Sequence, residues 1–212
     1  MSGPHDVSRV LQAGAPVKEA AGAVVLLHGR GGSADDILGL APALGMSKLA
    51  FLAPEAAGNT WYPQSFLSPR AQNEPYLTSA LEKVKRVVDG LVASGMPASR
   101  IAIGGFSQGA CLSSEFVASN PQRYAGLLVF TGGLIGPMGS DVSHPGDLAG
   151  TPVFLANGDA DPHIPWARTL ETAEALRAMG AEVEVQQYPG RPHTITMDEV
   201  TRAKALLEKA FR

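Results

Sequence analysis

The residues at 105–109 carry the pattern in this chain that most clearly suggests chemistry. They read Gly-Phe-Ser-Gln-Gly, which fits G-x-S-x-G, and they stand between an apolar run at 101–104 and an amphipathic segment at 110–119. Gly105 and Gly109 lack the side chains that would collide on a tight strand-to-helix turn, so the turn can hold Ser107 in strained backbone geometry. The positive end of the following helix would favour a developing oxyanion. The pattern predicts that Ser107 is a nucleophile; the alternative is a glycine-rich turn that merely contains a serine.

A serine hydroxyl becomes a good nucleophile only when a base takes its proton and a third group orients that base. Histidines follow Ser107 at positions 144, 163 and 193. His193 lies in a loop with glycine and proline between the last apolar run and the last amphipathic segment, which suits the chain order serine, acid, histidine. His144 lies in a polar loop with no strand to position it. We therefore predict that His193 is the base, with His163 as its competitor.

The loop at 157–165 supplies the candidate acid. It follows an apolar run and contains Asp159 and Asp161, of which Asp161 directly precedes a proline-rich turn that would fix its direction. Asp159 lies closer to the end of the strand, where aspartate often caps a loop, so Asp161 is the predicted acid. A metal site built from Asp159, Asp161 and His163 is the alternative. Their spacing matches none of the strong metal-binding motifs, so no metal is expected.

The segment at 28–32 reads His-Gly-Arg-Gly-Gly and follows another apolar run. It is similar to the glycine-rich oxyanion loops of the HGGG type, in which backbone N–H groups approach the substrate carbonyl. The predicted oxyanion donors are the N–H of Arg30 and the N–H of Gln108, the residue after the nucleophile. We expect His28 to brace the loop through a hydrogen bond. The Arg30 guanidinium either favours a substrate with a carboxylate or phosphate or points to solvent.

The same segment permits a second interpretation. Gly29-x-Gly31-x-x-Ala34 after a strand approximates the dinucleotide-binding fingerprint, with Glu55 as the ribose ligand. That hypothesis leaves the serine, aspartate and histidine positions unexplained, and we do not favour it.

The loop at 59–67 is unusually aromatic for a connecting segment. Either its side chains form a satellite hydrophobic cluster under the loop, or they form one wall of an acyl-binding cleft, since such clefts are mostly apolar. On the second interpretation, the predicted substrate-binding residues are Trp61, Tyr62, Phe66, Leu134, Ile135, Ile164 and Trp166.

Short apolar runs alternate with longer amphipathic stretches along the chain, which predicts an α/β fold with a mostly parallel central sheet and helices on both faces. The expected strands are 23–27, 49–53, 101–104, 127–131, 153–157 and 183–188, with an antiparallel edge strand within 7–17. The expected helices are 34–44, 76–94, 108–119, 166–179 and 197–211. No linker composition divides the chain, so we expect a single domain over residues 1–212. The segment at 136–150 is too short for a large lid domain.

Composition excludes several classes of protein. The formal net charge is -3 and no basic block occurs, which argues against nucleic-acid binding. Cys111 is the single cysteine, so no internal disulfide is possible. We expect no signal peptide and no membrane span, and therefore a cytoplasmic protein. A homodimer through a strand edge or the loop at 59–67 is possible.

Taken together, these residues resemble the bacterial phospholipase/carboxylesterase family of α/β-hydrolases, which includes the acyl-protein thioesterases. The resemblance runs over nearly the whole chain from Val24. It is carried by His28-Gly29-x-Gly31, Trp61, Gly105-Phe106-Ser107-Gln108-Gly109, Gly158-x-x-Asp161-x-x-Ile164-Pro165 and His193, in that order.

The resemblance implies that Ser107 is the nucleophile, Asp161 the acid and His193 the base, with oxyanion N–H groups from Arg30 and Gln108. It also implies activity on short-chain esters, lysophospholipids or acylated protein cysteines, without a cofactor. Two features depart from the thioesterase branch: Arg30 replaces a usually apolar residue, and Tyr62-Pro63 replaces the usual sequence after the tryptophan. They weaken the assignment as a protein thioesterase.

The predicted function is thus a carboxylesterase that acts on a small ester or thioester of short to medium acyl chain through an acyl-enzyme intermediate. A lysophospholipase or acyl thioesterase with the same triad is the alternative. A non-catalytic binding protein on this scaffold is a more distant one, because the scaffold alone does not determine function.

Overall fold

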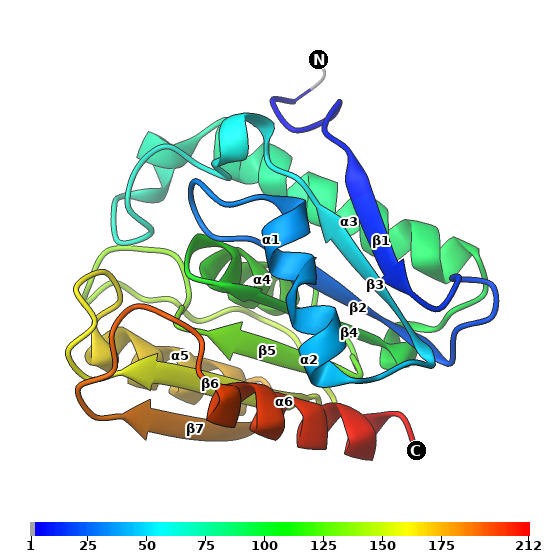
Figure 1. Cartoon of the computed structure of the whole chain (residues 1–212). Helices are drawn as coiled ribbons and strands as arrows, with labels where there is room; N and C mark the ends of the chain where they lie inside the picture. The colour runs from blue at the N-terminus through cyan, green and yellow to red at the C-terminus, as the bar shows by residue number, and fades with distance from the viewer. Residues whose placement is uncertain (1–2) are drawn as a thin grey trace.

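The computed structural model describes residues 3–212, in which seven strands form one sheet in the order β1-β3-β2-β4-β5-β6-β7. Every neighbouring pair is parallel except β1 and β3. The predicted mostly parallel sheet is therefore confirmed, and so is the antiparallel edge strand. The strands are β1 (Val10–Gly14), β2 (Gly22–Leu27), β3 (Leu49–Pro54), β4 (Ile101–Phe106), β5 (Gly126–Phe130), β6 (Pro152–Gly158) and β7 (Glu182–Tyr188) (Figure 1).

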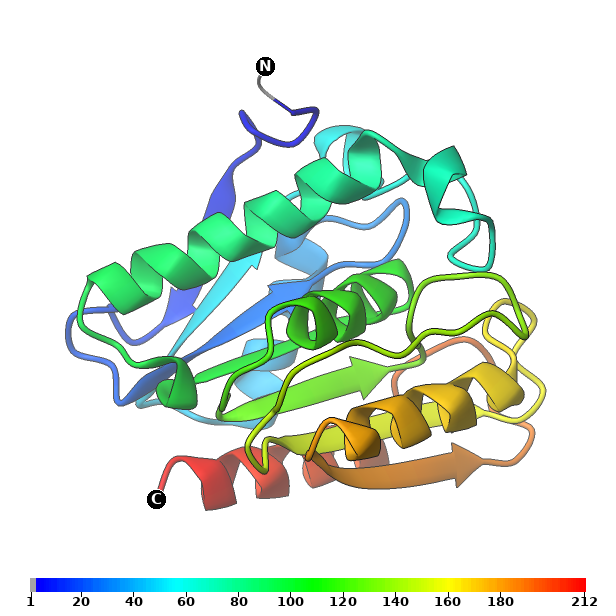
Figure 2. The ribbon, with the colours of Figure 1, turned by 180° about the vertical axis from the view of Figure 1, so that it is seen from behind.

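Helices cover both faces of the sheet. In Figure 1 the helices α1, α2 and α6 lie in front of the strands, and Figure 2 shows α3, α4 and α5 on the opposite face. No helix in residues 3–212 is long and apolar enough to cross a membrane. The helices are α1 (Ala34–Leu38), α2 (Leu40–Leu44), α3 (Tyr76–Ala93), α4 (Gln108–Ser119), α5 (Trp166–Ala178) and α6 (Met197–Ala210), with short 3-10 turns at Ala57–Asn59, Arg70–Asn73 and Ala98–Arg100.

Burial along each strand follows its position in the sheet. Every residue of β2, β3 and β5 is buried, as expected of strands that carry helices on both faces. β7, at the edge, alternates between exposed and half-buried residues over most of its length. Two apolar cores result, one under α3, α4 and α5 and the other under α1, α2 and α6.

One predicted helix is divided in two. The sequence predicted a continuous helix over 34–44, whereas α1 ends at Leu38 and α2 begins at Leu40, with Gly39 between them. Pro42 explains the break, because a proline in mid-helix has no N–H to donate and its ring clashes with the carbonyl four residues earlier. In the first turn of α2 the same proline is tolerated.

The chain brings six loops to one edge of the sheet. They follow β2, β3, β4, β5, β6 and β7, which run parallel and therefore end on the same side. Ligands in open α/β folds bind at the carboxyl ends of such strands. The fold thus collects the polar loops of the sequence at one place.

Candidate active site

Ser107 occupies a strained turn between β4 and α4. Its backbone angles are φ 54° and ψ -118°, outside the regions that a residue with a side chain ordinarily adopts. The flanking glycines are sterically required: a Cβ on Gly105 would lie 2.5 Å from the carbonyl carbon of Gly109, and a Cβ on Gly109 would lie 2.1 Å from the Leu27 oxygen. The Ser107 N–H donates to the Phe130 carbonyl at 3.1 Å, which holds the turn against β5.

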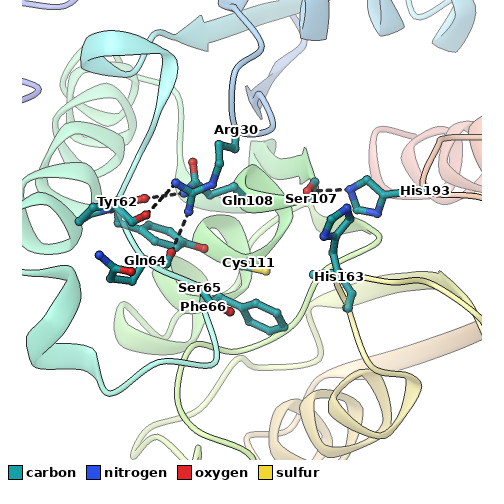
Figure 3. Close-up of a pocket in the computed structure, with 12 residues that line it drawn as sticks. Arg30, Tyr62, Gln64, Ser65, Phe66, Ser107, Gln108, Cys111, His163 and His193 are labelled. Carbon is teal, nitrogen blue, oxygen red and sulfur yellow. Dashed lines mark hydrogen bonds between the residues drawn. The ribbon is translucent and has the colours of Figure 1, made fainter.

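A chain of hydrogen bonds links Ser107, His193 and Asp161. His193 Nε2 lies 2.8 Å from Ser107 Oγ, and its Nδ1 lies 2.7 Å from Asp161 Oδ2. Figure 3 shows the Ser107 hydroxyl aimed at the His193 ring. The three residues come from the ends of β4, β7 and β6 respectively, so the sheet positions all three.

The Asp161 side chain is buried, and both of its carboxylate oxygens have hydrogen-bond partners. Its Oδ1 accepts hydrogen bonds from the backbone N–H groups of His163 and Ile164, both at 2.9 Å. Burial opposes ionisation, but the hydrogen bonds from His193 and these N–H groups outweigh it and hold the pKa of Asp161 below its usual value. The carboxyl group is therefore ionised at neutral pH and can orient His193 and stabilise its protonated form.

The competing residues make contacts other than a hydrogen bond to Ser107. Asp159 Oδ1 accepts from the Gly190 N–H at 2.8 Å, which ties the loop after β6 to the loop that carries His193. The His163 ring packs edge-on against the His193 ring at 4.9 Å. His144 contacts Glu115 at 3.4 Å. Within residues 3–212, no group of three or more His, Cys, Asp or Glu side chains is arranged to hold a metal ion.

The glycine-rich loop at 28–32 lies directly beside Ser107. A Cβ on Gly29 would lie 3.4 Å from the Ser107 Cβ. Neither the Arg30 N–H nor the Gln108 N–H donates a hydrogen bond to any residue in the range 3–212. The latter is the first N–H of α4, at the positive end of the helix dipole. Arg30 follows Gly29 and Gln108 follows Ser107 in the chain, and N–H groups without a partner near a nucleophile are the donors that an oxyanion requires.

His28 braces this loop as expected. Its Nδ1 lies 2.8 Å from the Gly29 oxygen, and its Nε2 accepts from the Ala56 N–H at 3.1 Å, so the hydrogen sits on Nδ1. Burial holds the pKa of His28 below its usual value. A second bridge joins the Gly31 N–H to the Asn59 carbonyl at 2.7 Å. The loop is thus fixed to the segment at 56–59.

Trp61 supports the glycine-rich loop at 28–32 and does not line the cavity. Its side chain is fully buried, its indole N–H donates to the His28 carbonyl at 2.9 Å, and its ring packs 5.0 Å from the His28 ring. Its backbone N–H donates to Gln108 Oε1 at 2.9 Å, and Gln108 Nε2 donates to the Tyr62 carbonyl at 2.8 Å. The Gln108 side chain therefore clamps the aromatic loop, a role that the sequence analysis missed.

A cavity of about 470 Å³ opens beside Ser107. Three of the seven predicted substrate-binding residues line it, namely Tyr62, Phe66 and Ile164, whereas Trp61, Leu134, Ile135 and Trp166 do not. The segment at 134–135 is drawn away because its N–H groups donate to Thr172 Oγ1 at 2.9 Å and to Glu115 Oε2 at 3.2 Å. The other lining residues are Arg30, Pro63, Gln64, Ser65, Ser107, Gln108, Cys111, His163 and His193 (Figure 3).

A second cavity of about 400 Å³ lies on the other side of the oxyanion loop, and it shares Arg30 and His193 with the first. Apolar side chains contribute much of its lining: Ile37, Leu40, Phe106 and Ile195. The scissile bond of a substrate at Ser107 would therefore lie between two cavities of different character.

An ion pair beneath the His193 loop was also missed by the sequence analysis. Arg191 and Glu199 are both buried and lie 3.6 Å apart. Arg191 Nη2 donates to Thr131 Oγ1 at 2.6 Å, and Nη1 donates to the Thr194 carbonyl. Burial raises the pKa of Glu199. The pair fixes both sides of the loop that presents His193.

A family model and a solved structure are similar to this chain over nearly its whole length. A family model described as Phospholipase/Carboxylesterase matches residues 9–211. A solved structure of a phospholipase/carboxylesterase from Dyadobacter fermentans is 45% identical, with a TM-score of 0.91 over 95% of this chain and 96% of that one. The α/β-hydrolase fold class and the family resemblance predicted from the sequence are confirmed.

Curated relatives match over a shorter stretch. The Acyl-protein thioesterase 1 of Neurospora crassa is 33% identical over 51% of this chain and 45% of its own length. A protein of Oryza sativa subsp. japonica named "Probable carboxylesterase" is 32% identical over 65% of this chain and 51% of its own length. The matches thus span about half the length of these relatives.

Proposed function

Because the chain belongs to the phospholipase/carboxylesterase family of hydrolases, we propose that it is a serine esterase that cleaves carboxylic esters of short to medium acyl chain with Ser107, Asp161 and His193 as its catalytic triad. One observation carries the proposal: the unbroken series of hydrogen bonds from Asp161 through His193 to Ser107, at 2.7 and 2.8 Å. That geometry is what general-base activation of a serine requires.

The mechanism proceeds in two steps. His193 Nε2 takes the proton from Ser107 Oγ as that oxygen attacks the ester carbonyl, and Asp161 holds the Nδ1–H tautomer and stabilises the imidazolium. The N–H groups of Arg30 and Gln108 stabilise the oxyanion. His193 then protonates the departing alcohol, which leaves an acyl group on Ser107. Water, deprotonated by the same histidine, releases the acid and regenerates the serine.

The size of the cavity supports the limit on acyl length. Its volume of about 470 Å³ suits a small substrate, and His163 and Ser65 lie among the residues that line it. The segment at 131–151, between β5 and β6, contains no helix or strand that could fold over the site as a lid. The cleft is therefore open, and long chains find no enclosed apolar channel.

Thioester hydrolysis is the second candidate. The observation that favours it is the 33% identity to a protein named as an acyl-protein thioesterase. The same triad serves, since a thiol leaves as readily as an alcohol once the tetrahedral intermediate forms.

Hydrolysis of p-nitrophenyl acetate, butyrate and octanoate, and of the matching thioesters, tests the proposal. Ser107→Ala should lower kcat/KM by at least about 10³-fold, while Ser143→Ala, an exposed serine in the loop at 136–150, leaves it unchanged. His193→Ala should be as damaging as Ser107→Ala, whereas His163→Ala should keep the triad reaction. Folded wild-type protein without activity on any of these substrates would contradict the proposal and favour a binding role.

A further inference from the structure

The cavity beside Ser107 is lined by a cationic side chain, that of Arg30, although the chain as a whole is acidic. The protein carries a formal net charge of -3. Nevertheless, Arg30, His163 and His193 line the cavity, and no acidic side chain from residues 3–212 does. A cleft for plain alkyl chains is mostly apolar. Here the polar side chains of Gln64, Ser65 and Gln108 also line the cavity.

Arg30 supplies the permanent charge, and its guanidinium is held in place. Nη1 donates to the Pro63 carbonyl at 2.9 Å and Nη2 donates to the Gln64 carbonyl at 2.7 Å. The guanidinium also lies 6.0 Å from the centre of the Tyr62 ring. Figure 3 shows it reaching over the cavity toward Gln64. Two of its five N–H groups are used in this way, so others remain for a ligand.

The charge of Arg30 is not compensated. Other arginines around the site pair with carboxylates: Arg70 with Glu115, Arg168 with Glu171 and Arg191 with Glu199. Arg30 forms no such pair with any residue in the range 3–212, and its two partners are neutral carbonyls. A guanidinium that is fixed, unpaired and in the wall of a reaction cleft is suited to bind an anionic oxygen group.

The Tyr62 side chain lies behind the same wall. The Tyr62 hydroxyl is buried, and it has no hydrogen-bond partner among residues 3–212. Burial, with the Cys111 thiol beside it, raises the pKa of Tyr62 well above its usual value, so the hydroxyl keeps its proton. Figure 3 shows it directed toward Cys111 at the inner side of the cavity.

We propose that this site prefers esters whose acyl group ends in an anionic oxygen group, a carboxylate or a phosphonate, which the Arg30 guanidinium binds. The inference rests on the proposed function. The cavity that holds Arg30 also holds Ser107 and Gln108, where the acyl group is attached and its oxyanion stabilised. The alcohol then lies in the second cavity, which carries Ile37, Leu40 and Ile195 and which His193 also lines, so that His193 can protonate the leaving group there. The substrates are then half-esters of short dicarboxylic acids with an apolar alcohol.

Matched butyl esters test the preference. Monobutyl glutarate carries the carboxylate, the corresponding monoamide is its neutral isostere, and butyl 3-phosphonopropionate carries the phosphonate. Release of butanol gives kcat/KM for each. We expect the wild type to prefer an anionic ester over the neutral amide by at least tenfold, and the preference to shrink as salt is raised. The ratio between carboxylate and phosphonate identifies which anion the site takes.

Variants of Arg30 locate the anion site. Arg30→Met should abolish the preference, Arg30→Lys should keep part of it, and Arg30→Glu should reverse it in favour of butyl 4-aminobutyrate. The ratio of two substrates is the readout, because it cancels any change in the backbone N–H of residue 30. Arg177→Met is the control, since Arg177 is exposed near the end of α5 and donates only to the Val183 carbonyl; it should keep the wild-type ratio.

The outcomes separate the two proposals. Equal rates on the anionic and neutral esters in the wild type would overturn the anion site and leave the esterase function standing. An anionic preference that survives in Arg30→Met would likewise overturn it. Failure to hydrolyse any ester would instead remove the proposed function on which the inference rests.

Discussion

Trp61 lies in the loop beside the active site, but its side chain is buried and does not line the cavity. The indole N–H holds the carbonyl of His28 at 2.9 Å, and the backbone N–H is held by Gln108. Both partners belong to the proposed oxyanion site, since His28 begins the loop that carries Arg30 and the N–H of Gln108 is itself a proposed donor. The residue therefore couples the geometry of the two donors.

Trp61→Phe should lower kcat by about tenfold while KM changes little. The ring is largely kept, but the His28 carbonyl loses its donor, which costs about 1–2 kcal/mol and loosens the oxyanion loop. Because the support is common to all substrates, the loss should be the same for acetate, butyrate and octanoate esters. A change in chain-length preference with kcat intact would instead show that Trp61 forms part of the acyl pocket.

Two glycines in helices should respond to alanine in opposite ways. In Gly109→Ala the new Cβ would lie 2.1 Å from the Leu27 oxygen, so β2 and α4 must separate and we expect loss of folding or of all activity. In Gly90→Ala, on the exposed side of α3, the Cβ meets nothing within 4 Å. It should stabilise the protein by about 0.5–1 kcal/mol through helix propensity. Thermal and urea unfolding of both variants, with esterase activity, checks this pair.

At the scale of elements, the segment before β1 is joined to the active-site loops. His5 is fully buried, its Nε2 lies 2.9 Å from the Trp61 carbonyl, and its Nδ1 accepts from the Ala57 N–H at 3.0 Å. Its own N–H donates to Ser79 Oγ on α3 at 3.0 Å. The first residues of the described chain therefore hold the loop that in turn holds the oxyanion donors.

His5→Ala should weaken both stability and catalysis. It leaves the buried Trp61 carbonyl without a partner, at a cost of about 1–3 kcal/mol, and it also removes the acceptor of the part-buried Ala57 N–H. The freed loop should lower kcat with less effect on KM. Val7→Ala is the matched control, because Val7 lies in the same segment and is 94% exposed. Differential scanning calorimetry and ester kinetics give the two readouts; a His5→Ala protein that behaves like Val7→Ala would refute the link.

The elements and the site differ in how far the sequence predicts them. Near-continuous apolar runs identified the strands, because strands covered on both faces exclude polar side chains. Ser107, Asp161 and His193 could be singled out because each follows a strand and carries chemistry. The cavity wall could not, because hydrophobicity does not distinguish a side chain that faces a cleft from one that supports a loop. Trp61 and Leu134 were expected in the wall and lie in the core instead.

Over the whole molecule, stability depends on two histidines that fold in their neutral forms. Burial is the main cause that lowers the pKa of both His5 and His28. Each ring has one nitrogen that accepts a backbone hydrogen bond, from Ala57 and from Ala56 respectively. Protonation of that nitrogen removes the acceptor and places a charge in the core beside Trp61. These two histidines therefore bind a proton less readily in the folded protein than in the unfolded chain.

The sign of the pH dependence follows from these lowered pKa values. In the unfolded chain a histidine titrates near pH 6.5, so below that pH the unfolded state binds more protons than the folded state. The free energy of unfolding should be constant above about pH 6.5 and fall as the pH drops, by up to about 1.4 kcal/mol per pH unit for each histidine, until the folded pKa is passed. Asp161, whose pKa is also lowered, contributes only nearer pH 4.

Urea unfolding, monitored by tryptophan fluorescence at pH 7.5, 6.5 and 5.5, should show this fall in the free energy of unfolding of the wild type. His5→Gln removes one titrating group while keeping an amide that can bond the loop. The free energy of unfolding of this variant should therefore fall less between pH 6.5 and 5.5, and the difference from the wild type is the contribution of His5. Glu199, whose pKa burial raises, is present in both proteins, so its contribution cancels in the comparison. If the two profiles run parallel, His5 takes up its proton equally well in the folded and unfolded states, and the buried histidines do not set the acid limit of the fold.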